Sequence, residues 1–306
     1  MITFDSGKNQ SEMLLKDYIK DGIAALSALY PQEEARSMVM FYCAEVLGFP
    51  SYQHITEPKT EVPAELLDKA VEDMRRMAAS EPLQYILGYT EFCDRTFKVD
   101  ARALIPRAET EVLCMKAEEM VKGTKPADQL KVLDLCTGSG CIAWTIAMDL
   151  PGAEVVATDL SAEALALAGE QFKRRSKKVL RPRFVKADLL DIEGTASAVG
   201  LPSFDLITAN PPYVMTSEKV EMRPNVLGWE PHMAIFAPDR DPLAFHKAIA
   251  VLALKLLAPG GCAIVELNTE IARETAAVFS AAGFSSVEIV PDWFDRPRFV
   301  SFRKPE

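Results

Sequence analysis

The amino-acid sequence predicts an α/β protein in which a seven-stranded mixed sheet follows a small N-terminal helical bundle. From position 131 onward, short strand-like runs alternate with stretches long enough for crossovers, which is typical of a largely parallel sheet. Residues 1–85 instead show only helical apolar periodicity. The chain has 306 residues with 49% apolar content, enough for a large core plus a smaller one, so we expect two domains.

The predicted helical domain spans residues 1–85. Turn signals at Tyr30-Pro31 and between Pro50 and Pro63 divide it into three helical stretches. It contains 14 acidic and 8 basic side chains, a net charge of −6 out of −10 for the whole chain. We therefore expect a separate acidic module.

Residues 86–106 are predicted to form a hairpin linker, because two strand-like runs surround a turn at Cys93 to Arg95. The remaining residues, 107–306, should hold the sheet. Its predicted strands are KVLDL (131–135), EVVATD (154–159), RFVKAD (183–188), FDLITA (204–209), GCAIVEL (261–267), SSVEIV (285–290) and RFVSFRK (298–304). Only seven residues separate the last two strands, too few for a helical crossover, so we expect an antiparallel hairpin at one edge.

A glycine-containing loop follows the first predicted strand, and a helix follows the loop. The loop reads Cys136-Thr137-Gly138-Ser139-Gly140, and glycines at such a turn let the backbone approach a ligand closely. Gly138, Gly140 and Ala143 also satisfy the spacing of a dinucleotide site, with Asp159 where a ribose-binding acid belongs. Nicotinamide binding is therefore one alternative at this loop.

Acidic residues near the strand ends favour S-adenosylmethionine over a dinucleotide. Asp134 lies just before the loop, where a carboxylate suits a cationic cofactor better than a pyrophosphate. Asp159 could accept from both ribose hydroxyls, and Asp188 from an adenine amino group. Each acid alone could equally cap the following helix, and Ser161 is itself a good N-cap. Three acids at one sheet edge nevertheless indicate a ligand site.

The fourth strand ends in Asn210-Pro211-Pro212-Tyr213. The prolines end the strand and stiffen the loop, so the Asn210 side-chain oxygen and the Pro211 carbonyl can face one substrate NH2 group. Two such acceptors would orient the nitrogen lone pair toward an electrophilic methyl group, with Tyr213 stacked on the substrate. We expect amino-group methylation without a general base, although the tetrapeptide alone could be a simple turn.

Composition argues against several other classes of protein. The net charge of −10 disfavours direct DNA binding and anionic membranes, and no run of 18 apolar residues or secretory leader is present, so we expect a cytoplasmic protein. Six cysteines without a Cys-x-x-Cys pair and three scattered histidines do not suggest a metal site.

Several motifs in this order resemble the HemK-like (PrmC) release-factor glutamine methyltransferases. They are EPLQYILG (81–88), LIPRAETE (104–111), DLCTGSGCIA (134–143), VVATDLSAEAL (155–165) and FDLITANPPYV (204–214), with looser matches at Glu230-Pro231 and 257–267. The resemblance implies a class I methyltransferase (Rossmann-like) fold and S-adenosyl-L-methionine as donor. It also implies that the substrate is the glutamine amide in the Gly-Gly-Gln motif of class 1 peptide-chain release factors.

The resemblance assigns roles to individual residues and also shows departures. It places the donor at Cys136 to Gly140, Asp159, Asp188 and Leu189, and the glutamine at Asn210 to Tyr213. The family usually has glycine at Cys136, an aromatic residue near Leu189 and asparagine near Gln171, and its Asp-Leu-Ala-Gly-x-Asp-Arg ending is shortened here. The cysteine need not obstruct the ligand if the chain there has a negative φ.

Alternatives remain open for function and for two further motifs. Glutamine methylation of a ribosomal protein, adenine methylation of nucleic acid, or donor binding without catalysis could use much of the same site. In LIPRAETE, Arg107 or Glu109 could lie beside the active site or serve only the local fold. Eight basic side chains between 172 and 186 form a solvated surface or a docking surface.

Overall fold

The computed structural model describes residues 13–200 and 203–306, which form two compact units. Of the described residues, the first unit includes those up to Leu87 together with Pro224–Trp229, and the second includes those in Gly88–Arg223 and Glu230–Glu306. The N-terminal stretch in which no secretory pattern was recognised, and the start of the first predicted helix, lie outside the described residues. Among the described residues, no helix is long and apolar enough to cross a membrane.

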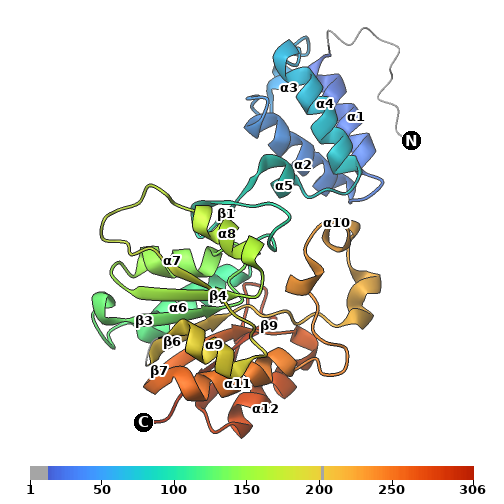
Figure 1. Cartoon of the computed structure of the whole chain (residues 1–306). Helices are drawn as coiled ribbons and strands as arrows, with labels where there is room; N and C mark the ends of the chain where they lie inside the picture. The colour runs from blue at the N-terminus through green and yellow to red at the C-terminus, as the bar shows by residue number, and fades with distance from the viewer. Residues whose placement is uncertain (1–12, 201–202) are drawn as a thin grey trace. The chain divides into compact units, whose positions relative to one another are not determined.

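The first unit is helical, as its sequence predicted (Figure 1). Its helices are α1 (Leu15–Leu26), α2 (Gln32–Glu45), α3 (Gln53–Thr56), α4 (Ala64–Ala78), α5 (Leu83–Leu87) and the distant short turn α10 (Pro224–Leu227). Apolar faces of α1, α2 and α4 make one core. Within it, the hydroxyl of Tyr42 donates to Asp73 Oδ2 over 2.7 Å, and Asp73 also pairs with Lys69 and Arg76. A buried carboxylate therefore has its partners supplied within the bundle.

The predicted hairpin exists, and it belongs to the second unit. Strands β1 (Tyr89–Phe92) and β2 (Arg95–Lys98) pair antiparallel around Cys93 and Asp94, which have φ of 48° and 56°. Two consecutive positive φ angles are what a type I′ hairpin turn requires. The compact units divide at 87/88. The sequence predicted domain boundaries at 85/86 and 106/107, and these boundaries stay predictions.

The main sheet has seven strands in the order β5-β4-β3-β6-β7-β9-β8. Its strands are β3 (Lys131–Leu135), β4 (Glu154–Asp159), β5 (Arg183–Lys186), β6 (Phe204–Ala209), β7 (Leu257–Glu266), β8 (Ser285–Pro291) and β9 (Pro297–Arg303). The first five run parallel, and β9 pairs antiparallel with both β7 and β8. The prediction of seven strands with an antiparallel hairpin at one edge is confirmed.

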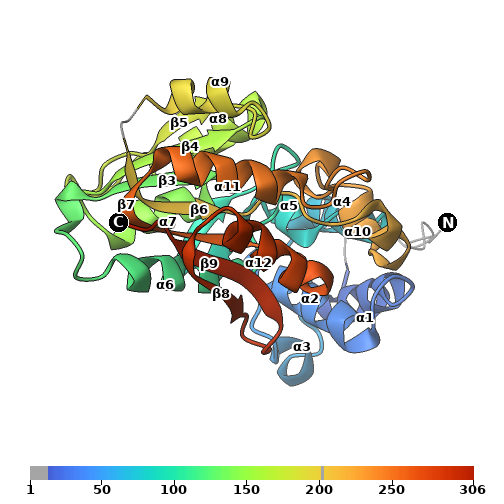
Figure 2. The ribbon, with the colours of Figure 1, turned by 90° about the horizontal axis from the view of Figure 1, so that it is seen from below.

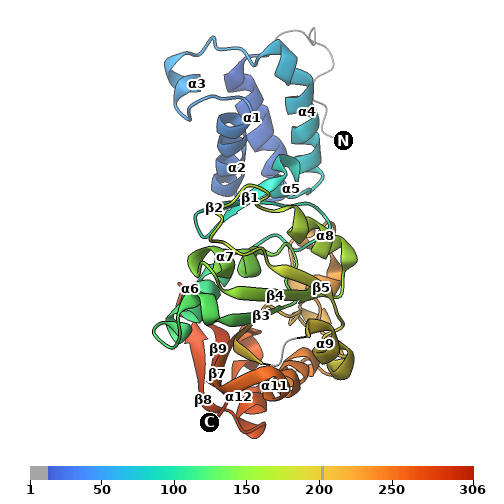
Figure 3. The same cartoon turned by 60° about the vertical axis from the view of Figure 1, so that its left-hand side comes forward.

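Helices cover both faces of this sheet (Figures 2 and 3). On one face lie α6 (Thr110–Val121), α7 (Cys141–Asp149) and α8 (Ala162–Glu170); on the other lie α9 (Ile192–Val199), α11 (Ala244–Leu256) and α12 (Ala272–Ala281). Separate apolar cores fill the two faces: Trp144 and Leu113 are fully buried on the first, and Phe279 and Leu252 on the second. This three-layer arrangement places the carboxyl ends of β3, β4, β5 and β6 along one edge.

Short 3-10 turns complete the second unit. They are η1 (Ala127–Gln129), η2 (Thr216–Glu221), η3 (His232–Ala234) and η4 (Thr269–Ile271). The basic run at 172–186, which follows α8 and includes β5, is exposed for most of its length. Three of its arginines hydrogen-bond to backbone carbonyls: Arg175 to Val179, Arg181 to Gly169, and Arg183 to Val199. Part of this run therefore serves the local fold, and a docking role stays a prediction.

Candidate active site

A cavity of about 320 Å³ opens at the carboxyl ends of the parallel strands. Its walls include Cys136, Thr137, Gly138, Ser139, Asp159, Asp188, Leu189, Asn210 and Pro212. These nine are among the residues predicted from the sequence, and they come from the ends of β3, β4, β5 and β6. Asp134, Gly140, Pro211 and Tyr213 were also predicted and are not among the lining residues. The structure thus brings the glycine loop and the Asn210 loop to one cavity.

The glycine loop turns sharply between β3 and α7. Gly138 and Gly140 have φ of 54° and 82°, and Cys136 has φ of 57°. Glycine adopts such angles without strain, whereas a cysteine there carries a steric penalty. The negative φ considered for Cys136 is therefore not what the structure has. At Gly140 an added Cβ would lie 2.9 Å from Ala168 Cβ, so this glycine serves close packing against α8.

Polar atoms under and around the loop fit a charged ligand. Asp134 is completely buried, and its Oδ1 accepts from the Thr208 hydroxyl over 2.8 Å. Its Oδ2, the Thr137 hydroxyl and the Ser139 hydroxyl are buried without a hydrogen-bond partner of ordinary geometry among the described residues. Burial raises the pKa of Asp134 to about 7. A cationic ligand would favour the ionised form of Asp134. These polar atoms therefore suit a ligand amino group better than a pyrophosphate.

The two other predicted acids differ in their surroundings. Asp159 is held by two backbone donors, Gly138 N–H on Oδ2 and Ser161 N–H on Oδ1, each over 2.9 Å. Burial raises the pKa of Asp159, and these donors oppose that rise. Asp188 is exposed, and its Oδ1 accepts from Leu190 N–H over 2.9 Å. Both acids line the cavity. Backbone donors hold both oxygens of Asp159, whereas Asp188 has one backbone donor, in the local turn to Leu190.

The Asn210 loop is tied to a buried carboxylate. Asn210 Nδ2 lies 3.5 Å from the hydroxyl of Thr110, which donates to Glu266 Oε2 over 2.8 Å. The Tyr213 hydroxyl donates to Glu266 Oε1, also over 2.8 Å. Tyr213 thus anchors the loop to β7, and its predicted stacking on a substrate stays a prediction. Thr110 and Glu266 were both missed as site residues in the sequence.

A second buried acid holds the segment before α6. Glu230 accepts from the backbone N–H of Ile105 over 3.0 Å and pairs with Arg107 over 2.6 Å. Arg107 and Pro231 line the cavity. Of the two candidates in LIPRAETE, Arg107 is therefore at the site, while Glu109 is not among the lining residues.

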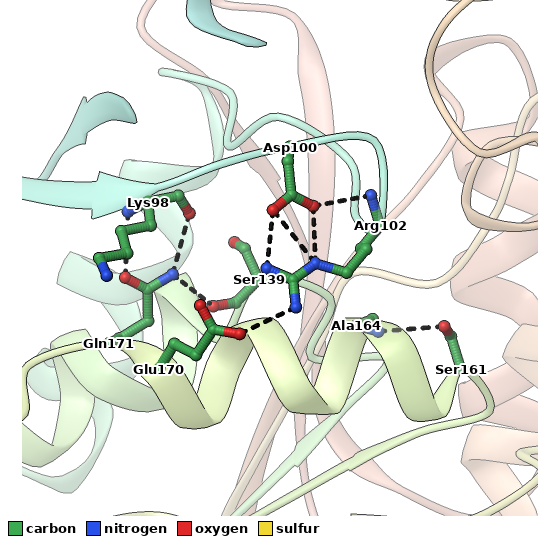
Figure 4. Close-up of polar contacts among 8 residues, drawn as sticks. All are labelled: Lys98, Asp100, Arg102, Ser139, Ser161, Ala164, Glu170 and Gln171. Atoms are coloured by element: carbon green, nitrogen blue, oxygen red, sulfur yellow. Dashed lines mark hydrogen bonds and ion pairs between the residues drawn. The ribbon is translucent and has the colours of Figure 1, made fainter. Parts of the chain in front are cut away.

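The chain between β2 and α6 is secured against α8 (Figure 4). Arg102 pairs with Asp100 and reaches Glu170 over 2.9 Å. The Gln171 side chain accepts from the backbone N–H of Lys98 over 3.0 Å and donates to the carbonyl of Lys98 over 2.9 Å (Figure 4). The same amide lies 3.4 Å from the carbonyl of Ser139 in the glycine loop. Gln171, where an asparagine was expected, thus joins the hairpin, α8 and the loop.

Comparisons with known proteins agree with this architecture. A family profile described as the PrmC N-terminal domain matches residues 17–88, and one described as a methyltransferase domain matches residues 133–216. A release factor glutamine methyltransferase of Bacteroides thetaiotaomicron is 36% identical over 278 residues, which is 90% of this chain and 95% of that protein. The chain belongs to the release factor glutamine methyltransferase family.

Other relatives of the release factor glutamine methyltransferase family match along most of the chain. A member from Deinococcus radiodurans is 34% identical over 95% of this chain and 99% of its own length. The solved protein-(glutamine-N5) methyltransferase (release factor-specific) of Alicyclobacillus acidocaldarius is 28% identical, with 69% of this chain and all of that chain covered at a TM-score of 0.40. Family membership makes this chain an S-adenosylmethionine-dependent methyltransferase, which sets aside the dinucleotide interpretation of the glycine loop.

Proposed function

We propose that this chain transfers a methyl group from S-adenosylmethionine to the side-chain amide nitrogen of a glutamine. We further propose that this glutamine is the one in the Gly-Gly-Gln motif of a class 1 peptide-chain release factor. One observation supports this most directly: in a chain of this family, the glycine loop and Asn210 line the same cavity. The reaction then needs the protein mainly to bind and orient its two ligands.

The donor is assigned to the side of the cavity formed by β3, β4 and β5. When bound, S-adenosylmethionine supplies a methyl group activated by a sulfonium. Asp134, Thr137 and Ser139 offer buried polar atoms to its charged amino-acid end. Asp159 would accept from the ribose hydroxyls, and Asp188 with Leu189 would border the adenine.

The acceptor amide is assigned to the Asn210 loop. The Asn210 Oδ1 and the Pro211 carbonyl would each accept one hydrogen of the glutamine NH2 group, which turns the nitrogen lone pair toward the methyl group. These acceptors also stabilise the positive charge that grows on nitrogen during attack. The proton leaves afterwards to water, so no side chain is assigned as general base.

The helical unit is assigned to recognition of the protein substrate. It holds the segment matched by the PrmC N-terminal domain profile, and its sequence carries a net charge of −6 up to residue 85. An acidic module suits a protein partner better than DNA. Since release factors work in translation, the reaction is assigned to the cytoplasm. Removal of residues 1–80 should abolish transfer to a whole release factor while S-adenosylhomocysteine still binds.

Mass spectrometry of a release factor incubated with the chain and S-adenosylmethionine tests the proposal. We expect a gain of one methyl group on the glutamine of the Gly-Gly-Gln peptide. Transfer only to a ribosomal protein, or only to adenine in DNA, would replace the proposed substrate. No transfer to the release factor together with tight binding of reduced nicotinamide would overturn both donor and reaction.

A further inference from the structure

Glu266 is a buried carboxylate that the proposed reaction does not itself use. It lies at the end of β7, is 2% exposed and does not belong to the residues lining the cavity. One hydroxyl is directed at each of its oxygens, from Thr110 and Tyr213. Burial raises the pKa of Glu266, and these two hydroxyls oppose that rise. Each hydroxyl donates to the Glu266 oxygen that it faces, and that oxygen accepts.

The direction of these bonds determines what Thr110 can offer to Asn210. A threonine hydroxyl has a single hydrogen, and here Glu266 takes it. Only lone pairs of the Thr110 oxygen then remain for Asn210. The end of the Asn210 amide that faces Thr110 should therefore be the hydrogen-bond donor, Nδ2. In the structure Nδ2 does face Thr110, and it lies 3.5 Å from the hydroxyl oxygen.

The opposite orientation of the amide would be unfavourable. Exchanging the oxygen and nitrogen of Asn210 would bring its Oδ1 against an oxygen that has no hydrogen left to give. Amide orientation is otherwise weakly determined, because the two ends have nearly the same shape. With Nδ2 directed at Thr110, Oδ1 is directed away from it and is available to accept a hydrogen from the substrate.

We propose that Glu266, acting through Thr110, is a positioning residue that selects the orientation of the Asn210 amide in which Oδ1 serves the substrate NH2 group. The inference rests on the proposed function. Tyr213 extends the same arrangement, because its bond to the other Glu266 oxygen holds the far end of the tetrapeptide on β7. Asn210, Thr110, Glu266 and Tyr213 then act as one unit.

The contacts from Glu266 through Thr110 to Asn210 form a relay, which substitutions at Thr110 of similar shape can test. Thr110→Val keeps the volume and removes the hydroxyl, whereas Thr110→Ser keeps the hydroxyl. We expect Thr110→Val to lower kcat on the release factor about 10- to 100-fold, since misplaced acceptors cost about that much. Thr110→Ser should stay within about threefold of the parent, because it preserves the hydrogen-bond direction. Thr275→Val is the control, since it removes another fully buried hydroxyl, which lies in α12 and donates to the carbonyl of Ile271, and should leave kcat unchanged.

Binding measurements separate positioning from folding. Affinity for S-adenosylhomocysteine should remain within about threefold of the parent in all three variants, because the relay acts on the acceptor side. Affinity for a Gly-Gly-Gln peptide in the presence of S-adenosylhomocysteine should fall about fivefold or more in Thr110→Val only. If Thr110→Val does not bind S-adenosylhomocysteine, Thr110→Ala takes its place with the same expectations.

A Glu266 variant tests whether Glu266 acts on Asn210 through Thr110. Glu266→Gln should lower kcat in the parent by a larger factor than it does in the Thr110→Val background, because the part of its effect that passes through Thr110 is already lost there and only the part through Tyr213 remains. Parent-like kcat in Thr110→Val, or additive losses in the double variant, would overturn the relay and leave the proposed function intact. A parent enzyme that does not methylate the release factor would instead refute the proposed function.

Discussion

Alanine at Gly140 and alanine at Gly138 should have clearly different effects, although both glycines lie in one loop with positive φ. An alanine in the left-handed region costs about 1–2 kcal/mol of folding free energy. At Gly138 an added Cβ meets nothing within 4 Å, so this is the whole expected cost. At Gly140 the Cβ would lie 2.9 Å from Ala168 Cβ and 3.2 Å from Trp144 Cδ1. Overpacking of this kind costs about 1–3 kcal/mol more.

The two costs can be measured as melting temperatures. A domain of this size loses about 2–4 °C per kcal/mol, so Gly140→Ala should melt at least about 4 °C below the parent and well below Gly138→Ala. Gly138→Ala should instead weaken S-adenosylhomocysteine binding about tenfold or more, because its methyl group occupies space at the cavity wall. Differential scanning calorimetry and titration calorimetry give the two quantities. If both variants melt within about 2 °C of each other, the packing argument from Ala168 and Trp144 is wrong.

Three further changes test the site and the helical unit. Asn210→Ala should lower kcat about 100- to 1000-fold while S-adenosylhomocysteine affinity stays within about threefold; parent-like kcat would remove Asn210 from the mechanism. Because burial raises the pKa of Asp134 to about 7, its ionised form gains with pH, and affinity for S-adenosylmethionine should rise between about pH 6 and pH 8. Asp134→Asn should remove the part of that rise centred near pH 7, and an unchanged titration would assign it to another group. Tyr42→Phe should lower the free energy of unfolding of the helical unit by about 1–3 kcal/mol in urea titrations, because Asp73 loses a buried donor. Tyr52→Phe, at a side chain 63% exposed, should show no comparable loss.

Much of the sheet could be predicted because its strands are short apolar runs between long crossovers. The PDWFDRP segment even predicted the antiparallel pairing of the last two strands. The order of those strands was not predictable: β9 lies between β7 and β8. A short connection requires only that two strands pair, and it does not say which of them contacts the rest of the sheet.

The site was predictable where a rule connects strand order to position. Parallel strands deliver their carboxyl ends to one edge, so the glycine loop, Asp159 and Asn210 were expected together. The acid Glu266 was missed because a charged residue at the end of an apolar strand is usually read as exposed. Its position at the end of the strand next to the Asn210 strand was the available signal.

Local backbone geometry was the least predictable feature. Cys136 adopts a φ of 57°, although only a few per cent of non-glycine residues do so. The residue type does not predict this positive φ, because the angle is imposed by the tight turn from β3 into α7. A family pattern with glycine at this position was the one available hint.

The hydrogen bonds between Gln171 and Lys98 limit how short a fragment that keeps the whole cavity can be. Arg102, Ala103, Leu104 and Pro106 all line the cavity, yet they precede the start of the sheet domain that the sequence predicted at residue 107. Truncation there would leave every strand of the main sheet in place and would remove part of the cavity wall. A fragment that keeps the whole cavity wall therefore has to begin at the hairpin, near Gly88, so that the segment 98–106, which Gln171 holds at Lys98, remains part of it.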